Sequence, residues 1–213
     1  MQVMKIITAT FAVSLWLCGP SSKAADDTYG TLVKRVKAGD FLVDFRALRL
    51  ACMESTACYP RAKPEDLASL SRVEAAGQYN KAVALTEQMI DEGFVNIEAH
   101  ASCASAYAKL NKPEKAQFHR DVAAALLRSI LTSGDGKGAK TAFEVISDRE
   151  EYVVLSSRGL PHYGSAVTSF REFSDGRHKY ERWEVRDPKT QQNIELFFIV
   201  DAFYPTKSRA PGR

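Results

Sequence analysis

The stretch LTSGDGKGAKTAF, residues 131–143, carries the residue types of a phosphate-binding loop. Such a P-loop has the pattern G-x-x-x-x-G-K-[ST], in which backbone amides and a lysine hold the phosphates. Gly134, Lys140 and Thr141 match this pattern, whereas Ala139 stands where the second glycine is needed. These residue types could support anion or small-ligand binding, and the candidate ligand-binding residues are Ser133, Asp135, Lys137, Lys140 and Thr141.

The elements expected around this stretch argue against nucleotide hydrolysis. A P-loop follows a buried strand and leads into a helix whose amino terminus faces the phosphates. Here a helical pattern precedes the loop and the strand-like run TAFEVI follows it. We therefore interpret the stretch as a helix-to-strand turn, in which Gly134, Gly136 and Gly138 supply positive φ angles and close backbone approach. A small-ligand or anion site, or an enzyme built on this loop, is the alternative.

The other reactive residue types do not form a recognisable catalytic or metal-binding pattern. His100 and Cys103 are three residues apart on an expected helix, but no third or fourth ligand lies near them in sequence. We predict that both belong to the core. We also predict no catalytic residue, no metal and no cofactor, so the sequence favours a non-catalytic protein over an enzyme.

The first 24 residues have the three parts of a Sec signal peptide. Lys5 is the positive region, residues 6–18 are mostly apolar, and Ser22-Lys23-Ala24 places small residues at positions −3 and −1. We predict cleavage after Ala24, a periplasmic or secreted mature chain, and no membrane span once the signal is removed. The alternatives are a membrane anchor, which needs about 20 apolar residues, and lipoprotein processing at Cys18.

Export to an oxidising compartment favours disulfide formation. Three cysteines follow the signal peptide, and Cys52 and Cys58 enclose a short loop. We predict a disulfide between these two residues, which leaves Cys103 without a partner. Three buried thiols are the alternative.

The charge of the chain does not favour a nucleic-acid partner. The formal net charge is +3, and it falls to +1 when Lys5 and Lys23 are removed with the signal peptide. Three further positive charges lie in the tail 205–213, whose proline and glycine suit a disordered end. No concentrated basic face is left for nucleic acid.

A 34-residue repeat organises the region before the loop. The segments GQYNKAVALTEQMIDEGFVN (77–96) and NKPEKAQFHRDVAAALLRSI (111–130) align Ala82 with Ala116. Apolar and small residues at helical spacing predict helix pairs at 64–76/79–92 and 97–110/113–132. Residues 28–52 predict another pair, divided at Gly39, with Phe41 and Phe45 on its apolar stripe. The middle region, about 63–130, resembles tetratricopeptide repeats, which implies a stack of helical hairpins with a concave face suited to peptides or protein segments.

The pattern of apolar residues changes at Thr141, and from there the order β–α–β–β–β is expected. A short apolar run is followed by a helix that ends at Gly159 and then by strand-like segments at 166–173, 178–187 and 193–203. Asp175-Gly176 is a strong hairpin signal, so the last three strands should form an antiparallel meander. Trp183 and Val185 should share its buried face. The run LFFIV is apolar on both faces, which predicts a central or covered strand.

Two segments of this chain, 133–160 and 43–51, resemble an exported bacterial family catalogued as domain of unknown function 4919. The residues that carry the resemblance are Ser-Gly-Asp-Gly-Lys (133–137), Thr-Ala-Phe-Glu-Val-Ile (141–146), a Glu-Tyr helix and an upstream helix with an aromatic–Arg pair. Family members often have serine after Gly-Lys, where this chain has Gly138. The resemblance implies fold relatives and export, and it implies no chemistry.

Together these observations predict an α+β fold in which helical hairpins pack with a small antiparallel meander carrying one helix. The expected organisation is a signal peptide (1–24), a tetratricopeptide-like helical region (25–132), a β–α–β–β–β region (133–204) and a basic tail (205–213). The expected function is a non-catalytic interaction or scaffold protein with a protein or peptide partner in the cell envelope.

Overall fold

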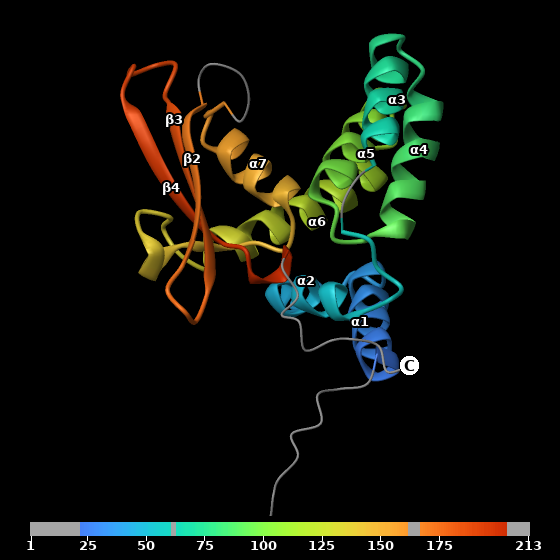
Figure 1. Cartoon of the computed structure of the whole chain (residues 1–213). Helices are drawn as coiled ribbons and strands as arrows, with labels where there is room; N and C mark the ends of the chain where they lie inside the picture. Colours follow the sequence, from blue (N-terminus) through green and yellow to red (C-terminus); the bar gives the residue numbers. More distant parts are fainter. Residues whose placement is uncertain (1–21, 61–62, 162–166, 204–213) are drawn as a thin grey trace, which may run out of the picture.

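The computed structural model describes residues 22–60, 63–161 and 167–203. Most of the predicted signal peptide and the whole basic tail lie outside the described residues. The described chain has the predicted α+β fold, because six α-helices are followed by a four-stranded sheet that carries a seventh (Figure 1). None of the helices in these ranges combines the length and the apolar character that crossing a membrane requires.

The helical region consists of three consecutive helix pairs, of which the second and third match the predicted bounds to within one residue. Each pair is joined by a short connection and its two members pack on each other. The helices are α1 (Ser22–Lys37), α2 (Phe45–Glu54), α3 (Pro64–Ala75), α4 (Tyr79–Glu92), α5 (Ile97–Lys109) and α6 (Pro113–Leu131).

Local sequence explains where these helices begin. Pro64 and Pro113 occupy the first turn of α3 and α6, where the missing N–H leaves no hydrogen bond unmade. The Asn96 side chain caps α5 by accepting a 3.0 Å hydrogen bond from the Ala99 amide. Ala82 and Ala116, which align in the 34-residue repeat, are fully buried. The likeness of these pairs to tetratricopeptide repeats stays a prediction.

The prediction that Phe41 belongs to a helix is wrong. Helix α2 begins at Phe45, because the Asp44 carboxylate accepts hydrogen bonds from the amides of Arg46 (2.9 Å) and Ala47 (3.1 Å). Gly39 ends the preceding helix with a φ of +87°. Phe41 therefore lies in the connecting loop, although its spacing from Phe45 suits a helix.

The remaining elements follow the predicted order, but the sheet is mixed. They are β1 (Phe143–Glu144), α7 (Asp148–Ser157), β2 (Val167–Ser174), β3 (Lys179–Arg186) and β4 (Asn193–Ile199). The strands lie in the order β1-β4-β3-β2, and the last three form the expected antiparallel meander. Strand β1 adds to it in parallel, with Phe143 beside Phe198. Strand β4 is thus central, as its apolar sequence predicts.

Helix α7 covers one face of the sheet and packs on α5 and α6 with its other side, while α6 also contacts β1 directly (Figure 1). That face carries Trp183, Val185 and Leu196, each less than 10% exposed. The Tyr152 ring of α7 meets the Trp183 ring edge-on at 5.8 Å. Apolar and polar residues therefore alternate along β3 as the sequence predicts, and the apolar Trp183 and Val185 face the covering helix α7.

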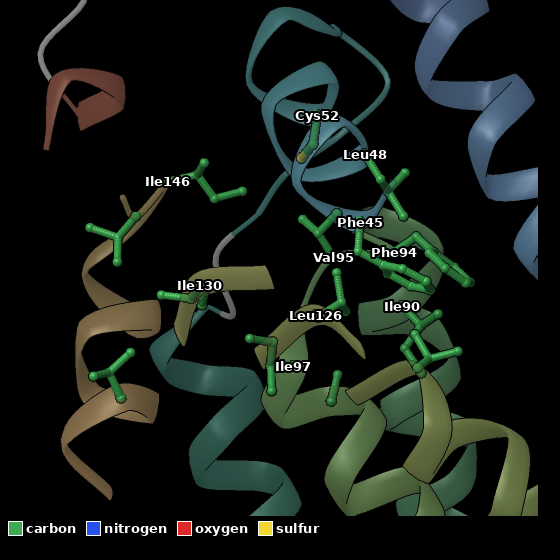
Figure 2. Packing of buried hydrophobic residues seen from close by; sticks show 14 of the residues in the cluster. Phe45, Leu48, Cys52, Ile90, Phe94, Val95, Ile97, Leu126, Ile130 and Ile146 are labelled. Carbon is green, nitrogen blue, oxygen red and sulfur yellow. The ribbon is translucent and has the colours of Figure 1, made fainter. Parts of the chain in front are cut away.

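The helical region and the sheet region share one hydrophobic core. Figure 2 shows how the core joins side chains from segments far apart in the sequence, with Phe45 and Leu48 of α2 beside Phe94 and Leu126. Ile146, which follows β1, extends the same cluster toward the sheet. Burial of this continuous apolar surface is the main force that holds the two regions together.

A buried ion pair crosses the same boundary. Arg49 of α2 is 1% exposed, and its guanidinium donates to both carboxylate oxygens of Glu150 on α7, at 2.7 and 2.5 Å. It also donates to the Glu144 carbonyl at 2.8 Å. The Ile146 amide completes the shell of Glu150 at 2.9 Å. The ion pair thus fixes the start of α7 against α2, and both the guanidinium and the carboxylate have additional hydrogen-bond partners in the backbone.

Candidate binding site

An open pocket of about 350 Å³ lies where the carboxyl end of α1 meets α4 and α6. Helix α4 contributes residues one turn apart, because Glu87, Ile90 and Asp91 fall on one face. Its apolar walls are Ile90, Phe94 and Phe118. Its polar lining consists of Lys37, Glu87, Asp91 and His119. Apolar walls with a few polar groups are the usual make-up of a binding pocket.

An exposed apolar loop borders this pocket. Leu42 is 94% exposed, and the neighbouring Phe41 ring is 37% exposed and lies edge-on to Phe118 at 6.0 Å. The loop is nevertheless held in place, because Asp40 accepts hydrogen bonds from the Leu42 amide (3.0 Å) and from the Arg35 guanidinium (2.7 and 2.9 Å). We refer to Phe41, Leu42, Phe118 and the pocket together as the docking surface.

His119 lines the pocket, and the buried His100 lies directly behind it, with the two ring centres 5.1 Å apart. His100 is fully buried, and its Nε2 lies 2.9 Å from the Phe94 carbonyl oxygen. A carbonyl only accepts, so His100 Nε2 carries the hydrogen. Burial lowers the pKa of His100 to about 3, so the ring is neutral and its Nδ1 is bare.

The same reasoning assigns the hydrogens of His119. Its Nδ1 lies 3.0 Å from the bare Nδ1 of His100, so it must be the donor of that hydrogen bond. Burial holds the pKa of His119 below its ordinary value of 6.5, against the nearby Glu87 carboxylate. A neutral His119 that donates through Nδ1 has a bare lone pair on Nε2. The pocket wall therefore presents a hydrogen-bond acceptor.

Glu87 supplies a second acceptor. The Tyr107 hydroxyl donates to its Oε1, and the Tyr107 ring stacks on His119 at 5.7 Å. Burial raises the pKa of Tyr107, and its hydrogen bond to Glu87 adds to this effect. Within the described residues, Glu87 Oε2 and His119 Nε2 form no hydrogen bond. The arrangement can therefore recognise a group that donates hydrogen bonds.

The predicted loop residues are brought together, but mainly to fold the loop itself. The amides of Asp135 and Gly136 both donate to the Thr141 carbonyl, at 3.0 and 2.8 Å. Asp135 accepts from the Thr141 hydroxyl (2.6 Å) and from the Lys137 amide (3.0 Å). The Ser133 hydroxyl donates to Ile130 and accepts from the Glu144 amide.

Two of the three loop glycines have the predicted roles. Gly136 has a φ of +72°, and a Cβ there would lie 2.3 Å from the Phe143 ring. A Cβ on Gly134 would lie 2.2 Å from the Thr141 carbonyl oxygen. Gly138 is extended and has no atom within 4 Å of a Cβ position. The side chains of Lys137 and Lys140 point outward from this turn and are exposed.

None of the described cysteines lines the pocket. Cys52 and Cys58 form a disulfide with their Cα atoms 5.2 Å apart, and it ties the end of α2 to the following loop. Cys103 is a buried free thiol. His100 contacts His119 rather than Cys103, and the described residues hold no group of three or more side chains that could ligate a metal.

The docking surface could not be found from the sequence, because its residues come from three separate segments, 37–42, 87–94 and 118–119. The only local signal is Phe41-Leu42, an apolar pair directly after Gly39-Asp40, where a turn is expected. Nothing in the sequence shows that His119 meets His100 rather than facing solvent.

The sequence profile of the family described as "Domain of unknown function (DUF4919)" matches residues 22–183. This segment contains the docking surface, the Ser133–Thr141 loop and the seven described α-helices. No curated protein and no solved structure matches the chain. Because the match covers most of its length, the chain belongs to this family, as the residues of the loop predict.

Proposed function

We propose that this member of the DUF4919 family is an exported, non-catalytic interaction protein that binds a segment of a partner protein in the cell envelope. The observation that carries the proposal is Leu42, which is 94% exposed on a loop fixed by hydrogen bonds beside an open pocket. A single exposed leucine needs no explanation. Here, however, Leu42, Phe41 and the ring-walled pocket are continuous, and such surfaces mark interaction sites.

A second hollow of about 410 Å³ lies along α5 and supports the proposal less well. It is lined mainly by small side chains such as Ala101, Ser102 and Ser105. Interfaces derive most of their affinity from large anchors that fill or enter pockets. The docking surface offers three such side chains, Phe41, Leu42 and Phe118, whereas Tyr79 is the single large apolar side chain that lines the hollow along α5, so we propose that binding occurs at the docking surface.

The Ser133–Thr141 loop gives no comparable support to the alternative function. An anion site of this kind needs amides that point at the ligand. The amides of Asp135, Gly136 and Lys137 instead donate to acceptors within the loop.

The disulfide between Cys52 and Cys58 supports export, because such bonds persist mainly in oxidising compartments. Amino-terminal sequencing of the protein purified from its own cells tests this part of the proposal. A mature chain that starts at Ala25 is expected. An intact amino terminus in the cytoplasmic fraction would contradict export.

Selection from a displayed library of random peptides tests the binding part without knowledge of the partner. Enriched peptides are expected to bind the wild-type chain and to lose at least tenfold in affinity with Leu42→Asp or Phe118→Ala. Lys189→Asp, on the exposed turn after β3, is the matched control and should bind as the wild type does. Thermal unfolding of each variant shows that the fold is retained.

Two outcomes would contradict the proposal. In one, no peptide is enriched above the background of an unrelated protein. In the other, the enriched peptides bind Leu42→Asp and Lys189→Asp equally well, which would place binding elsewhere on the molecule.

A further inference from the structure

The polar atoms that the pocket leaves without a partner are acceptors. His119 Nε2 is bare because its ring donates through Nδ1 to His100, which in turn donates through Nε2 to the Phe94 carbonyl. Glu87 Oε1 accepts a hydrogen bond from the Tyr107 hydroxyl, and its Oε2 forms no hydrogen bond with the described residues. Both residues line the same cavity. A ligand that fits must therefore bring hydrogen-bond donors.

The chain itself shows that this pocket accommodates a cation. The Lys37 ammonium lies 5.7 Å from the centre of the Phe94 ring and 3.6 Å from an Asp91 carboxylate oxygen. An aromatic face next to a carboxylate is a favourable place for a positive charge. Lys37 occupies the part of the pocket next to Asp91, whereas no lysine or arginine pairs with Glu87 in the described residues.

We propose that the pocket takes the cationic side chain of the partner segment, an arginine or a lysine, whose N–H groups donate to His119 Nε2 and to the open Glu87 oxygen. Its methylene stem then packs between Phe94 and Phe118, and Leu42 contacts an apolar residue of the same segment. This inference rests on the proposed function, because it names the chemistry that the docking surface recognises. The positive charge of the bound side chain is balanced by the Glu87 carboxylate, and binding involves no covalent step.

Binding of this kind depends on a neutral His119, so its charged surroundings matter. Lys37 faces the pocket from α1, and Glu87 and Asp91 face it from α4. From α5, His100 and Tyr107 contact the His119 ring, and on α6 Lys115 lies near it. Protonation of His119 would turn its acceptor into a donor and place a positive charge beside the bound cation. The ligand should therefore dissociate as the pH falls through the pKa of His119.

NMR titration of the histidine rings in the full chain tests the inference directly. The probe is Nα-acetyl-arginine amide, and the matched controls are the citrulline and glutamate analogues, which are neutral and acidic. Without a probe, His119 should show a bare Nε2 and a protonated Nδ1. The arginine probe should shift the Nε2 signal saturably and lower the pKa of His119 further, because it binds only the neutral ring. The controls should leave that pKa unchanged.

Two variants sharpen the result. Glu87→Gln keeps the shape of the side chain and removes its charge, so the arginine probe should bind roughly two- to fivefold more weakly. Lys37→Met removes a competing cation, so the probe should bind more tightly. A purely structural role for His119 would leave its pKa unmoved by the probe in all three proteins.

The inference is overturned if the citrulline analogue binds as well as the arginine probe, or if neither changes the His119 signals. Preferred binding of the glutamate analogue would also overturn it and would assign the pocket to an anion held by Lys37. Displayed peptides that require Leu42 but tolerate loss of their basic residues would overturn this inference alone and leave the proposed function standing.

Discussion

The substitution Glu151→Gln is expected to stabilise the protein at neutral and alkaline pH. Glu151 is fully buried on α7, and the facing Glu181 of β3 is only 6% exposed. Burial, with the neighbouring Glu181 charge as the next cause, raises the pKa of Glu151 from 4.5 to about 10. The folded protein therefore holds a proton at this carboxyl through the neutral range, whereas the unfolded chain does not.

The magnitude follows from proton linkage. A group whose pKa is raised on folding adds stability that is complete below its unfolded pKa and is lost as the pH rises toward its folded pKa. Between these values the loss is about 1.4 kcal/mol per pH unit. From pH 6 to pH 7.5 the wild type should thus lose about 2 kcal/mol through Glu151. The glutamine amide resembles the protonated acid and titrates nowhere in this range.

Urea unfolding of both proteins at several pH values between 5 and 8.5 measures this difference. The stability advantage of Glu151→Gln should grow steadily with pH. Glu150→Gln is a matched control on the adjacent residue, and it should destabilise by about 3–5 kcal/mol because it breaks a buried ion pair. A difference in stability between Glu151→Gln and wild type that stays constant with pH would show that Glu151 is not protonated in the folded protein at neutral pH.

Four further substitutions test the packing, the loop and the disulfide. Arg49→Met should lower the free energy of unfolding, measured with urea, by about 3–5 kcal/mol, because it leaves the buried Glu150 carboxylate without its partner. Gly136→Ala should lower the free energy of unfolding by about 2–4 kcal/mol, because Gly136 has a positive φ and a Cβ there would overlap the buried Phe143 ring. Gly138→Ala should change it by less than about 0.5 kcal/mol, because a Cβ at that position has no neighbouring atom within 4 Å. Equal costs at the two glycines would contradict this account of the loop. Cys52→Ala should lower stability by about 2 kcal/mol and leave Cys58 reactive toward alkylating reagents, whereas a Cys58 that is already reactive in the wild type would contradict the disulfide.

The helix pairs were predictable because their signals are local. Pro64 and Pro113 mark helix starts by conformational restriction, and the alignment of Ala82 with Ala116 marks equivalent packing positions. The central position of β4 was predictable for a similar reason, since an apolar sequence on both faces needs cover on both faces.

Features that join distant segments were not predictable in this way. Arg49 and Glu150 are 101 residues apart, and neither sequence context distinguishes them from exposed charges. The parallel pairing of the two-residue strand β1 with β4 places Phe143 beside Phe198, which is far from it in the sequence. Phe41 suits a helix by spacing, but the Asp44 cap starts the helix later and leaves Phe41 in the loop. The candidate loop site was found from its residue types, and the docking surface required the tertiary structure.

Site-specific photo-crosslinking in living cells shows whether the loop at Leu42 contacts an envelope partner, with the photoreactive residue placed at position 42 of the full chain. The account predicts a discrete adduct with an envelope protein from position 42 that is suppressed by Phe118→Ala and does not form from position 189. Mass spectrometry should map the adduct to a partner segment that contains an arginine or a lysine. Equal labelling from positions 42 and 189, or no adduct from position 42, would contradict binding at the docking surface.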